Sequence, residues 1–540
     1  MEQWSTKEQL RKLLTELVRI PTVTGSDAEL SFPSHIMQHL LSLPYFSIHP
    51  DYLRLIPTGD GRNAVTALVK RPDIRKTVVL ISHYDVVDVP DYGVWQDFAF
   101  HAEELTTAFY TRKHDLPPEV QSDLETGDWL FGRGTMDMKC GLALHMSMVE
   151  QAANGAFDGN ILLLTVPDEE VNSLGMRAVV PQLLEFSEQH ALEYCAVLNS
   201  EPMFSRYPGD PNQYLYMGSV GKVLPGFLCY GKETHVGEPF SGLNANQMAS
   251  LLTAEMELNS KFCEISSGEV TPPPTNLLQK DLKDAYSVQI PHRAVTLFNV
   301  FVLERRMDEL LDLLRQSAQR AASAISSSYL TRAQEFSRFQ ALPATEPNVA
   351  VLTYGELVTY ALNTYGKEQV EQVQAEVLHQ AALLDVRELS IRLVDRLAIL
   401  CKELSPMIVL FFAPPYYPAV ASGHDKAMQQ VVAAVVAKAK QTYGIELIPQ
   451  PYFPGISDLS YIGRQPASES LAPLLSNIPS WQTGYSLPLK EIEKLNLPVL
   501  NLGPVGKDAH QWTERLDVNY AFGPLRNLLK MAIQHSLQTF

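Results

Sequence analysis

An apolar run that ends in three consecutive acids stands in the first half of the chain, where residues 161–173 have the sequence ILLLTVPDEEVNS. The apolar part is typical of a buried strand. Asp168, Glu169 and Glu170 follow where that strand should end, and neighbouring carboxylates repel one another unless a positive charge neutralises them. Because neighbours in an extended segment point to opposite sides, one of Glu169 and Glu170 can bind a metal ion while the other faces water or substrate. Taken alone, these residues also fit an acidic surface loop.

Length, composition and charge narrow the class of protein. A chain of 540 residues is expected to form two or more domains, and its 46% hydrophobic and 19% charged residues are ordinary for a globular protein. The formal net charge of -18 argues against nucleic acid or an anionic membrane as a main partner. Five scattered cysteines without a CxxC pair argue against a disulfide framework and predict a cytoplasmic location. We also expect no secretory signal and no transmembrane helix.

Two further strand-like segments end in side chains that bind metals. Residues 76–82 lead into His83 and Asp85, and residues 194–198 lead to Glu201. In an extended segment His83 and Asp85 share a face, and a carboxylate that holds the far nitrogen of a metal-bound imidazole fixes its tautomer. Strands that alternate with helices predict a mostly parallel sheet, in which ligands gather beyond the carboxyl ends of the strands.

The candidate metal ligands form one set. Asp137 lies at a loop-to-helix junction in the glycine-rich segment 132–141, and a second histidine follows a glycine-proline turn near the end of the chain. Two imidazoles and three carboxylates suit a pair of zinc-class divalent ions, with manganese or cobalt left open; the set is His83, Asp137, Glu170, Glu201 and His510. Asp137 is the natural bridge, and such a pair activates water and polarises a carbonyl. Glu169 is then placed to act as general base.

The middle of the chain has a different pattern. A β/α alternation over residues 216–404 predicts a smaller inserted domain between two catalytic parts, 1–215 and 405–540. Helices expected at 370–384 and 386–404 enlarge that domain.

Two segments of the catalytic parts lack a clear secondary-structure pattern. Residues 88–130 are rich in Asp, Pro, Tyr and Trp without a clear period, and we expect surface loops there. Gly455-Ile456-Ser457-Asp458 predicts a polar turn that lines a pocket, which makes Asp458 a candidate substrate contact.

In their order and spacing, these motifs resemble the M20 family of metallopeptidases and amidohydrolases. The segments that carry the resemblance are LVRIPTVTG at 17–25, SHYD at 82–85, GRGTMDMK at 132–139, DEE at 168–170, SEP at 200–202 and GPVGKDAH at 503–510. The resemblance implies a zinc-peptidase-like α/β catalytic domain, whose mixed, mostly parallel sheet is flanked by helices, and an inserted α+β lid domain.

The resemblance also implies roles for single residues. One zinc would be held by His83, Asp137 and Glu201, and the other by Asp137, Glu170 and His510. These assignments imply two zinc ions that share one carboxylate.

The remaining roles concern proton transfer and the lid. Glu169 would be the general base, and Asp85 would orient His83. His235, within THVG at 234–237, matches a lid histidine that stabilises the oxyanion, often in the neighbouring subunit. This leaves two alternatives open: a homodimer through the lid, or extra helices at 350–404 that block this dimer or replace the partner subunit within one chain. Asn299 falls near a lid position that contacts substrate in relatives.

Within the family, the length, the long lid and the segment PDEEVNS resemble the arginine-utilisation protein RocB group. This implies a bacterial cytoplasmic hydrolase linked to arginine catabolism. The leading hypothesis is a dizinc hydrolase of an amide bond in a small peptide or an N-acyl amino acid. The alternative is a non-catalytic metabolite-binding or regulatory protein that keeps the fold; a complete ligand set together with Glu169 favours the enzyme.

Overall fold

A computed structural model describes residues 2–207, 209–341, 345–381, 384–465 and 471–540. The chain divides into two compact units. Unit 1 comprises Met1–Val220, Pro418–Pro466 and Pro488–Phe540, and unit 2 comprises Gly221–Tyr417 and Ala467–Leu487.

This division differs from the expected boundaries at the second junction. Residues 405–417 belong to unit 2 rather than to the second catalytic part, because strand β15 (Met407–Tyr417) pairs with β9 (Gly221–Tyr230) of that unit. Residues 467–487, also expected in the catalytic part, return to unit 2.

The centre of unit 1 is a mixed sheet. Within the described residues it has eight strands, in the order β1 (Leu53–Pro57), β2 (Asn63–Val69), β5 (Asn160–Val166), β3 (Lys76–His83), β6 (Glu193–Asn199), β18 (Val499–Asn501), β7 (Gln213–Tyr216) and β17 (Leu447–Gln450). The central strands β5, β3, β6 and β18 run parallel, whereas β1 and β2 pair antiparallel. Strands buried on both faces are near-continuous apolar runs, which is why their sequences showed no alternation.

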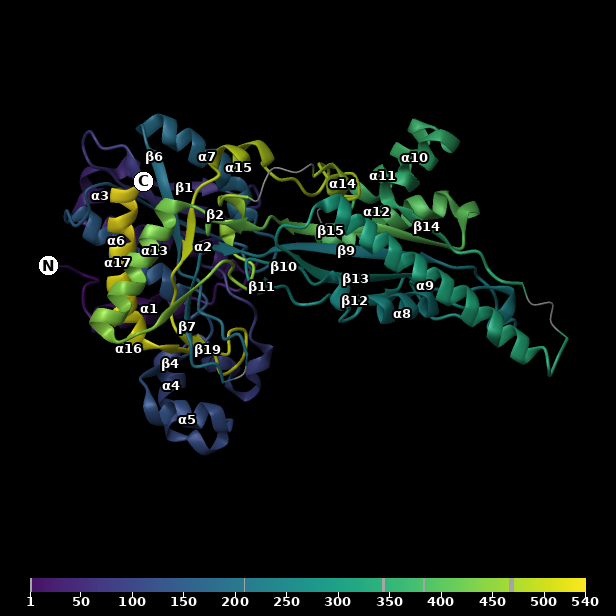
Figure 1. Ribbon diagram of the computed structural model, residues 1–540, viewed down its shortest axis with the longest axis horizontal. Coiled ribbons are helices and arrows are strands. Elements are labelled where there is room, and N and C mark those ends of the chain that lie inside the picture. Colours follow the sequence, from purple (N-terminus) through teal and green to yellow (C-terminus); the bar gives the residue numbers. More distant parts are fainter. Residues whose placement is uncertain (1, 208, 342–344, 382–383, 466–470) are drawn as a thin grey trace. The chain divides into compact units, whose positions relative to one another are not determined.

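Helices cover this sheet (Figure 1). The α-helices of unit 1 are α1 (Lys7–Val18), α2 (Asp27–Leu41), α3 (Pro44–Ile48), α4 (Ala102–Thr111), α5 (Pro118–Thr126), α6 (Lys139–Ala153), α7 (Leu174–His190), α13 (Lys426–Lys438), α15 (Leu489–Leu495), α16 (Val518–Tyr520) and α17 (Arg526–Thr539). Helices α6 and α17 contact β3, and Val78 and Leu80 of that strand belong to the core cluster that those helices share. Helix α7 packs against β1 and β2.

The expectation of surface loops at 88–130 is wrong. This segment forms the 3-10 helix η2 (Pro90–Phe98) and helices α4 and α5, and it leads into strand β4 (Trp129–Phe131). It has its own apolar cluster, which includes Leu105, Phe109, Val120 and Leu124. Each helix spans only about three turns and is bounded by prolines or charged residues, so its helical period is too short to stand out.

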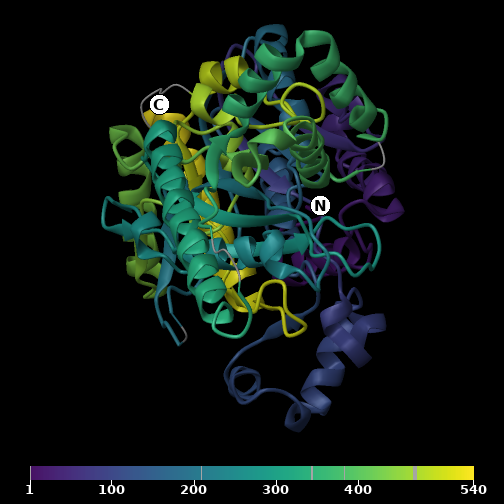
Figure 2. The same ribbon diagram turned by 90° about the vertical axis from the view of Figure 1, so that its right-hand side faces the viewer.

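Unit 2 is an α+β body. Within the described residues a sheet of five strands has the order β12 (Thr275–Asp281), β13 (Arg293–Val302), β9, β15 and β14 (Ala350–Thr353). Its helices are α8 (Ala245–Met256), α9 (Met307–Phe336), α10 (Tyr354–Tyr365), α11 (Lys367–Leu378), α12 (Val386–Leu400) and α14 (Ala472–Leu475), and a short ribbon consists of β10 (Ile265–Ser266) and β11 (Glu269–Val270). Figure 2 shows the long helix α9 in side view.

The expected helices of the 350–404 region are present with shorter bounds. The helix expected at 370–384 is α11, which ends at Leu378, and residues 382–383 lie outside the described residues. The helix expected at 386–404 is α12, which ends at Leu400. None of the helices in the described part of the chain is long and apolar enough to cross a membrane.

Candidate functional site

Three candidate ligands lie at one edge of the central sheet of unit 1. His83 is the last residue of β3, Glu170 follows β5, and Glu201 follows β6. Because β3 pairs in parallel with both β5 and β6, the carboxyl ends of these strands meet at the same edge.

The carboxylate of Asp137 stands between two imidazoles. Its Oδ1 lies 3.3 Å from Nε2 of His83, and its Oδ2 lies 3.2 Å from Nε2 of His510. Nε2 of His83 also lies 3.5 Å from Oε1 of Glu201, and Nε2 of His510 lies 3.1 Å from Oε1 of Glu170. The structure therefore brings all five candidate ligands together as two trios that share Asp137.

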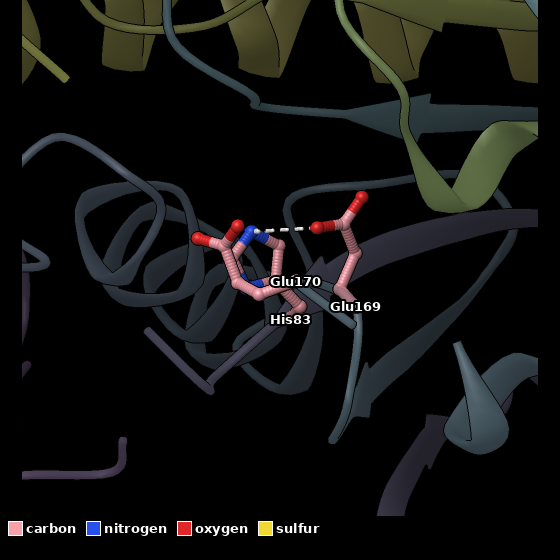
Figure 3. Close-up of side chains that lie close together, drawn as sticks. All are labelled: His83, Glu169 and Glu170. Atoms are coloured by element: carbon pink, nitrogen blue, oxygen red, sulfur yellow. Dashed lines mark ion pairs between the residues drawn. The ribbon is translucent and has the colours of Figure 1, made fainter. Parts of the chain in front are cut away.

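Glu169 lies beside these trios. It is buried, and its Oε2 lies 3.9 Å from Nε2 of His83. Figure 3 shows its carboxyl group turned toward the His83 ring, with Glu170 beside the same ring. One potential ligand atom from each of His83, Glu169 and Glu170 also lies within 4.8 Å of the other two. Geometry alone therefore allows Glu169 to be either a metal ligand or the general base.

The tautomer of His83 is set by the backbone. Its Nδ1 lies 3.0 Å from the carbonyl oxygen of Asp85, whereas the nearest carboxylate oxygen of Asp85 lies 3.6 Å away. An N–H on Nδ1 that donates to this carbonyl leaves the lone pair of Nε2 for a metal ion. The orienting contact expected from the Asp85 side chain is thus made mainly by its main chain.

The carboxylate of Asp85 holds the acidic turn instead. Its two oxygens accept the backbone N–H groups of Glu169, at 3.0 Å, and Glu170, at 3.2 Å, and Oδ2 also accepts the hydroxyl of Thr24 at 2.8 Å. Asp168, one residue earlier, has a left-handed backbone with φ of 68°, which Asp tolerates better than most residues. Asp85 therefore fixes the direction in which both glutamates leave the backbone.

A buried ion network supports Asp168. Nη1 of Arg62 donates to Oδ1 of Asp168 at 2.9 Å and to Glu29 at 3.1 Å. Glu29, which is fully buried, also accepts the backbone N–H of Asp168 at 3.0 Å. Buried charges need such partners, because an unpaired one is costly.

A second network positions Asp137. The buried carboxylate of Glu514 accepts the backbone N–H groups of Gly134 and Met136, at 2.8 and 3.3 Å, and pairs with Arg133 at 2.9 Å. At the neighbouring strand end, Gly503 allows a close approach, since a Cβ there would lie 1.7 Å from the carbonyl oxygen of Glu201. Both features bring loops from distant parts of the sequence against the ligands.

Burial shifts the pKa values of the acids in this site. Burial is the main cause that raises the pKa of Glu201 to about 7, and burial likewise raises the pKa of Glu169 well above its usual value. Burial alone would lower the pKa of His510, but its hydrogen bonds to Asp137 and Glu170 raise it to about 11. The two imidazoles are the groups that offset these carboxylates, and a divalent cation would relieve the remaining repulsion.

The donor set fits a pair of divalent metal ions. Each trio offers imidazole nitrogen and carboxylate oxygen, which are the ligands of zinc-class ions. Oε1 of Glu201 is buried and has no hydrogen-bond partner in the described part of the chain, although it faces His83. A metal ion bound there would give this buried oxygen the partner that it lacks.

Asp458 lies near the same site. It begins the 3-10 helix η9 (Asp458–Tyr461), it is 1% exposed, and neither of its carboxylate oxygens has a hydrogen-bond partner within the described residues. Burial raises its pKa well above the usual value; His83 opposes this shift, and Glu201 adds to it. The polar turn expected from the sequence thus places a buried acid beside the ligands.

The other two candidates belong to unit 2. His235 is exposed after β9, and its Nδ1 accepts the backbone N–H of Gly237 at 3.1 Å. Asn299 is a buried residue of β13, paired in register with Thr275 of β12. Their roles stay predictions.

Sequence reasoning did not find several residues that support the site. They are Thr24, Glu29, Arg62 and Arg133. One usable signal is a charged residue at a core-facing helix position, which Glu29 occupies in α2. Thr24 and Arg133 lie in segments that carry the family resemblance, whereas Arg62 leaves no local pattern.

Comparisons with known proteins agree with this geometry. The model of the family described as "Peptidase family M20/M25/M40" matches residues 79–476. The chain is 48% identical to protein YqjN of Bacillus subtilis, over 99% of this chain and 97% of that protein. It is 30% identical to protein RocB of the same organism, over 99% and 96%. Among solved structures it is similar in fold to the di-peptidase Dug1p from Saccharomyces cerevisiae, with a TM-score of 0.56 at 13% identity, over 98% and 96% of the two chains.

The match of the family model spans well over half of the chain, and two relatives align with it over almost their whole length. We conclude that the chain belongs to the M20 family and is a metallopeptidase or amidohydrolase of that family.

Proposed function

We propose that this enzyme is a dinuclear zinc hydrolase that cleaves an amide bond in a small peptide or an N-acyl amino acid. The observation that carries the proposal is the pair of donor trios that share Asp137, with its two oxygens 3.3 and 3.2 Å from the two imidazoles. His83, Asp137 and Glu201 would hold one ion, and Asp137, Glu170 and His510 the other. When bound, such ions supply Lewis acidity, which lowers the pKa of water and polarises a carbonyl.

Glu169 is the proposed general base. It is buried beside His83 and does not make the closest contacts of either trio. In the proposed reaction its carboxylate takes a proton from the attacking water and returns it to the nitrogen of the leaving group. Asp85 supports this role because it holds the backbone N–H of Glu169.

Substrate contacts are proposed for three residues. His235 would donate to the oxyanion, and Asn299 would bind substrate; both proposals rest on the family resemblance. Asp458 has support from its own surroundings, since it is a buried carboxylate without a hydrogen-bond partner among the described residues. Burial raises its pKa, an effect that His83 opposes and Glu201 increases.

A link to arginine catabolism is also proposed, from the 30% identity to RocB. An amide substrate is supported by membership of the peptidase family M20/M25/M40. A homodimer through unit 2 and a cytoplasmic location stay predictions; light scattering on the purified protein tests the first.

The test combines metal analysis with a substrate screen. Protein purified without chelator and supplied with zinc is expected to hold about two ions per chain, and His510→Ala about one. A panel of dipeptides and N-acyl amino acids, arginine derivatives first, is then assayed for release of free amine. No bound metal after zinc addition would refute the proposal, and two bound ions without turnover of any panel member would favour the binding-protein alternative.

A further inference from the structure

His510 is held differently from the other four ligands. Its side chain is 47% exposed, and it lies in the loop between β19 (Gly506–Lys507) and β20 (Arg515–Asp517) rather than at the edge of the central sheet. Asp508 and His510 have left-handed backbones with φ of 59° and 62°. Residues other than glycine keep this conformation only where their surroundings enforce it.

Arg515 holds this loop by hydrogen bonds to two of its residues. It is 1% exposed, and its Nη1 donates to the carboxylate of Asp508 and to the carbonyl oxygen of Thr513, the latter at 3.0 Å. The hydroxyl of Thr513 donates to the same Asp508 carboxylate at 2.7 Å. The backbone on both sides of His510 is therefore tied to one buried guanidinium.

That guanidinium is anchored by Asp123 of helix α5. Oδ2 of Asp123 accepts Nε and Nη2 of Arg515 at 2.9 and 2.6 Å, and Oδ1 accepts Nζ of Lys507 at 2.7 Å. Lys507 precedes His510 and Arg515 follows it. One carboxylate thus binds both ends of the loop, with one oxygen on Arg515 and the other on Lys507.

The rest of the helical segment, residues 90–131, makes further contacts with the His510 loop and its neighbours. Its strand β4 pairs antiparallel with β20. The ring of Phe109 lies 5.7 Å from that of Trp512, two residues after His510, and Trp512 packs on the apolar cluster of the segment. Asp91 of the same segment pairs with Arg133 at 2.9 Å, and Arg133 binds Glu514.

We propose that the helical segment 90–131 is a clamp that positions His510 for the metal ion held by Asp137, Glu170 and His510, with Asp123 as its main positioning residue. The proposal rests on the proposed metal site. It gives a role to a segment with its own core between β3 and Asp137, since the buried contacts of Asp123 reach the loop of one ligand, whereas Glu103 and Asp128 pair with helix α1.

The test is Asp123→Asn, with Glu125→Gln as matched control. Asn removes the charge that binds Lys507 and Arg515, while Arg515 keeps the partly exposed Asp508 as a partner, so the protein is expected to fold. Glu125 lies on the same helix, is mostly exposed and pairs with Lys113. Titration of the protein with cobalt(II) or zinc should show two binding steps. In Asp123→Asn the affinity of the weaker step should fall about 10–100-fold, the range found for residues that support metal ligands, and the affinity of the other step should not change.

A second measurement does not depend on metal. In the metal-free protein, amide hydrogen exchange over residues 506–514 should be faster in Asp123→Asn than in the parent or in Glu125→Gln. If Asp123→Asn does not fold, Lys507→Gln, which removes the half-exposed partner of the same carboxylate, replaces it in both measurements.

The outcomes separate the clamp from the proposed function. Selective weakening of one binding step, together with faster exchange over 506–514, supports the clamp. Two unchanged binding steps, equal weakening of both, or unchanged exchange would overturn it. Absence of two binding steps in the parent protein would refute the proposed dinuclear function, and the exchange comparison would then decide the clamp alone.

Discussion

Replacing Glu169 by Gln separates the two roles that the geometry allows this residue. Gln keeps the size and shape of the buried side chain but cannot accept a proton. The turn should keep its shape, because Asp85 holds the backbone N–H of Glu169 at 3.0 Å and not its side chain. The change is therefore confined to the carboxylate beside His83.

The expected magnitude follows from the contacts. Oε2 of Glu169 lies 3.9 Å from Nε2 of His83, farther than the Asp137 oxygen at 3.3 Å and the Glu201 oxygen at 3.5 Å. As a base rather than a ligand, Glu169 should contribute about 10²–10⁴-fold to kcat, or about 3–5 kcal/mol of activation free energy. Metal content should stay at the parental value.

The assay measures kcat and KM with the best substrate of the screen, beside metal content by elemental analysis on the same dialysed samples. A drop in kcat with both ions retained is the expected result. Turnover at the parental rate would refute the base assignment. Loss of an ion would instead make Glu169 a ligand, which the proximity of His83, Glu169 and Glu170 allows. Glu125→Gln is the matched control for an exposed Glu-to-Gln change.

The contacts around the site predict three further outcomes. Asp85→Asn replaces one carboxylate oxygen, which accepts a backbone N–H of the acidic turn, by an amide N–H group that faces this donor. In initial-rate assays kcat should therefore fall about 10–100-fold. A parental kcat would contradict the role of Asp85 in holding the turn. Arg62→Met leaves Glu29 and Asp168 buried without their cation, which should lower the free energy of unfolding by about 3–5 kcal/mol; an unchanged urea midpoint would speak against it. Because burial raises the pKa of Glu201 to about 7, zinc must displace a proton below that pH, and loss of this one proton should raise the zinc affinity about fivefold between pH 6 and 7. Equal dissociation constants at both pH values would show that Glu201 is already ionised.

The catalytic sheet could be predicted from sequence because its strands are long apolar runs that end in polar side chains. The strand expected at 76–82 is β3, and the run at 161–165 lies within β5. The ligands were found for the same reason, since a parallel sheet brings the ends of its strands to one edge. The shared position of Asp137 between two imidazoles then follows from its glycine-rich loop.

The supporting networks could not be predicted, because their partners are far apart in the chain. Arg62 and Asp168 are 106 positions apart, and Asp123 and Arg515 are 392 apart. Neither pair leaves a local pattern, because no secondary-structure period connects residues so far apart in the chain. The helices of segment 90–131 were missed for another reason. Short helices next to prolines have too few turns to show a recognisable helical periodicity of apolar residues.

The start of the first helix cannot be fixed from the capping motif alone. Ser5 with Glu8 and Thr6 with Gln9 both have capping-box spacing. The structure uses Thr6 and Gln9, with Lys7 as the first helical residue.

The chain passes between its two units four times, at residues 220–221, 417–418, 466–467 and 487–488. Unit 2 is therefore not a cassette that a single excision can remove. A gene from which only residues 221–417 were deleted would still encode residues 467–487, whose Asn477 accepts the backbone N–H groups of Gly355 and Phe412 in unit 2. Exchange of this unit between related proteins, by recombination or by design, requires two segments to be replaced together. A protease that cuts one connection would nick the molecule without releasing either unit.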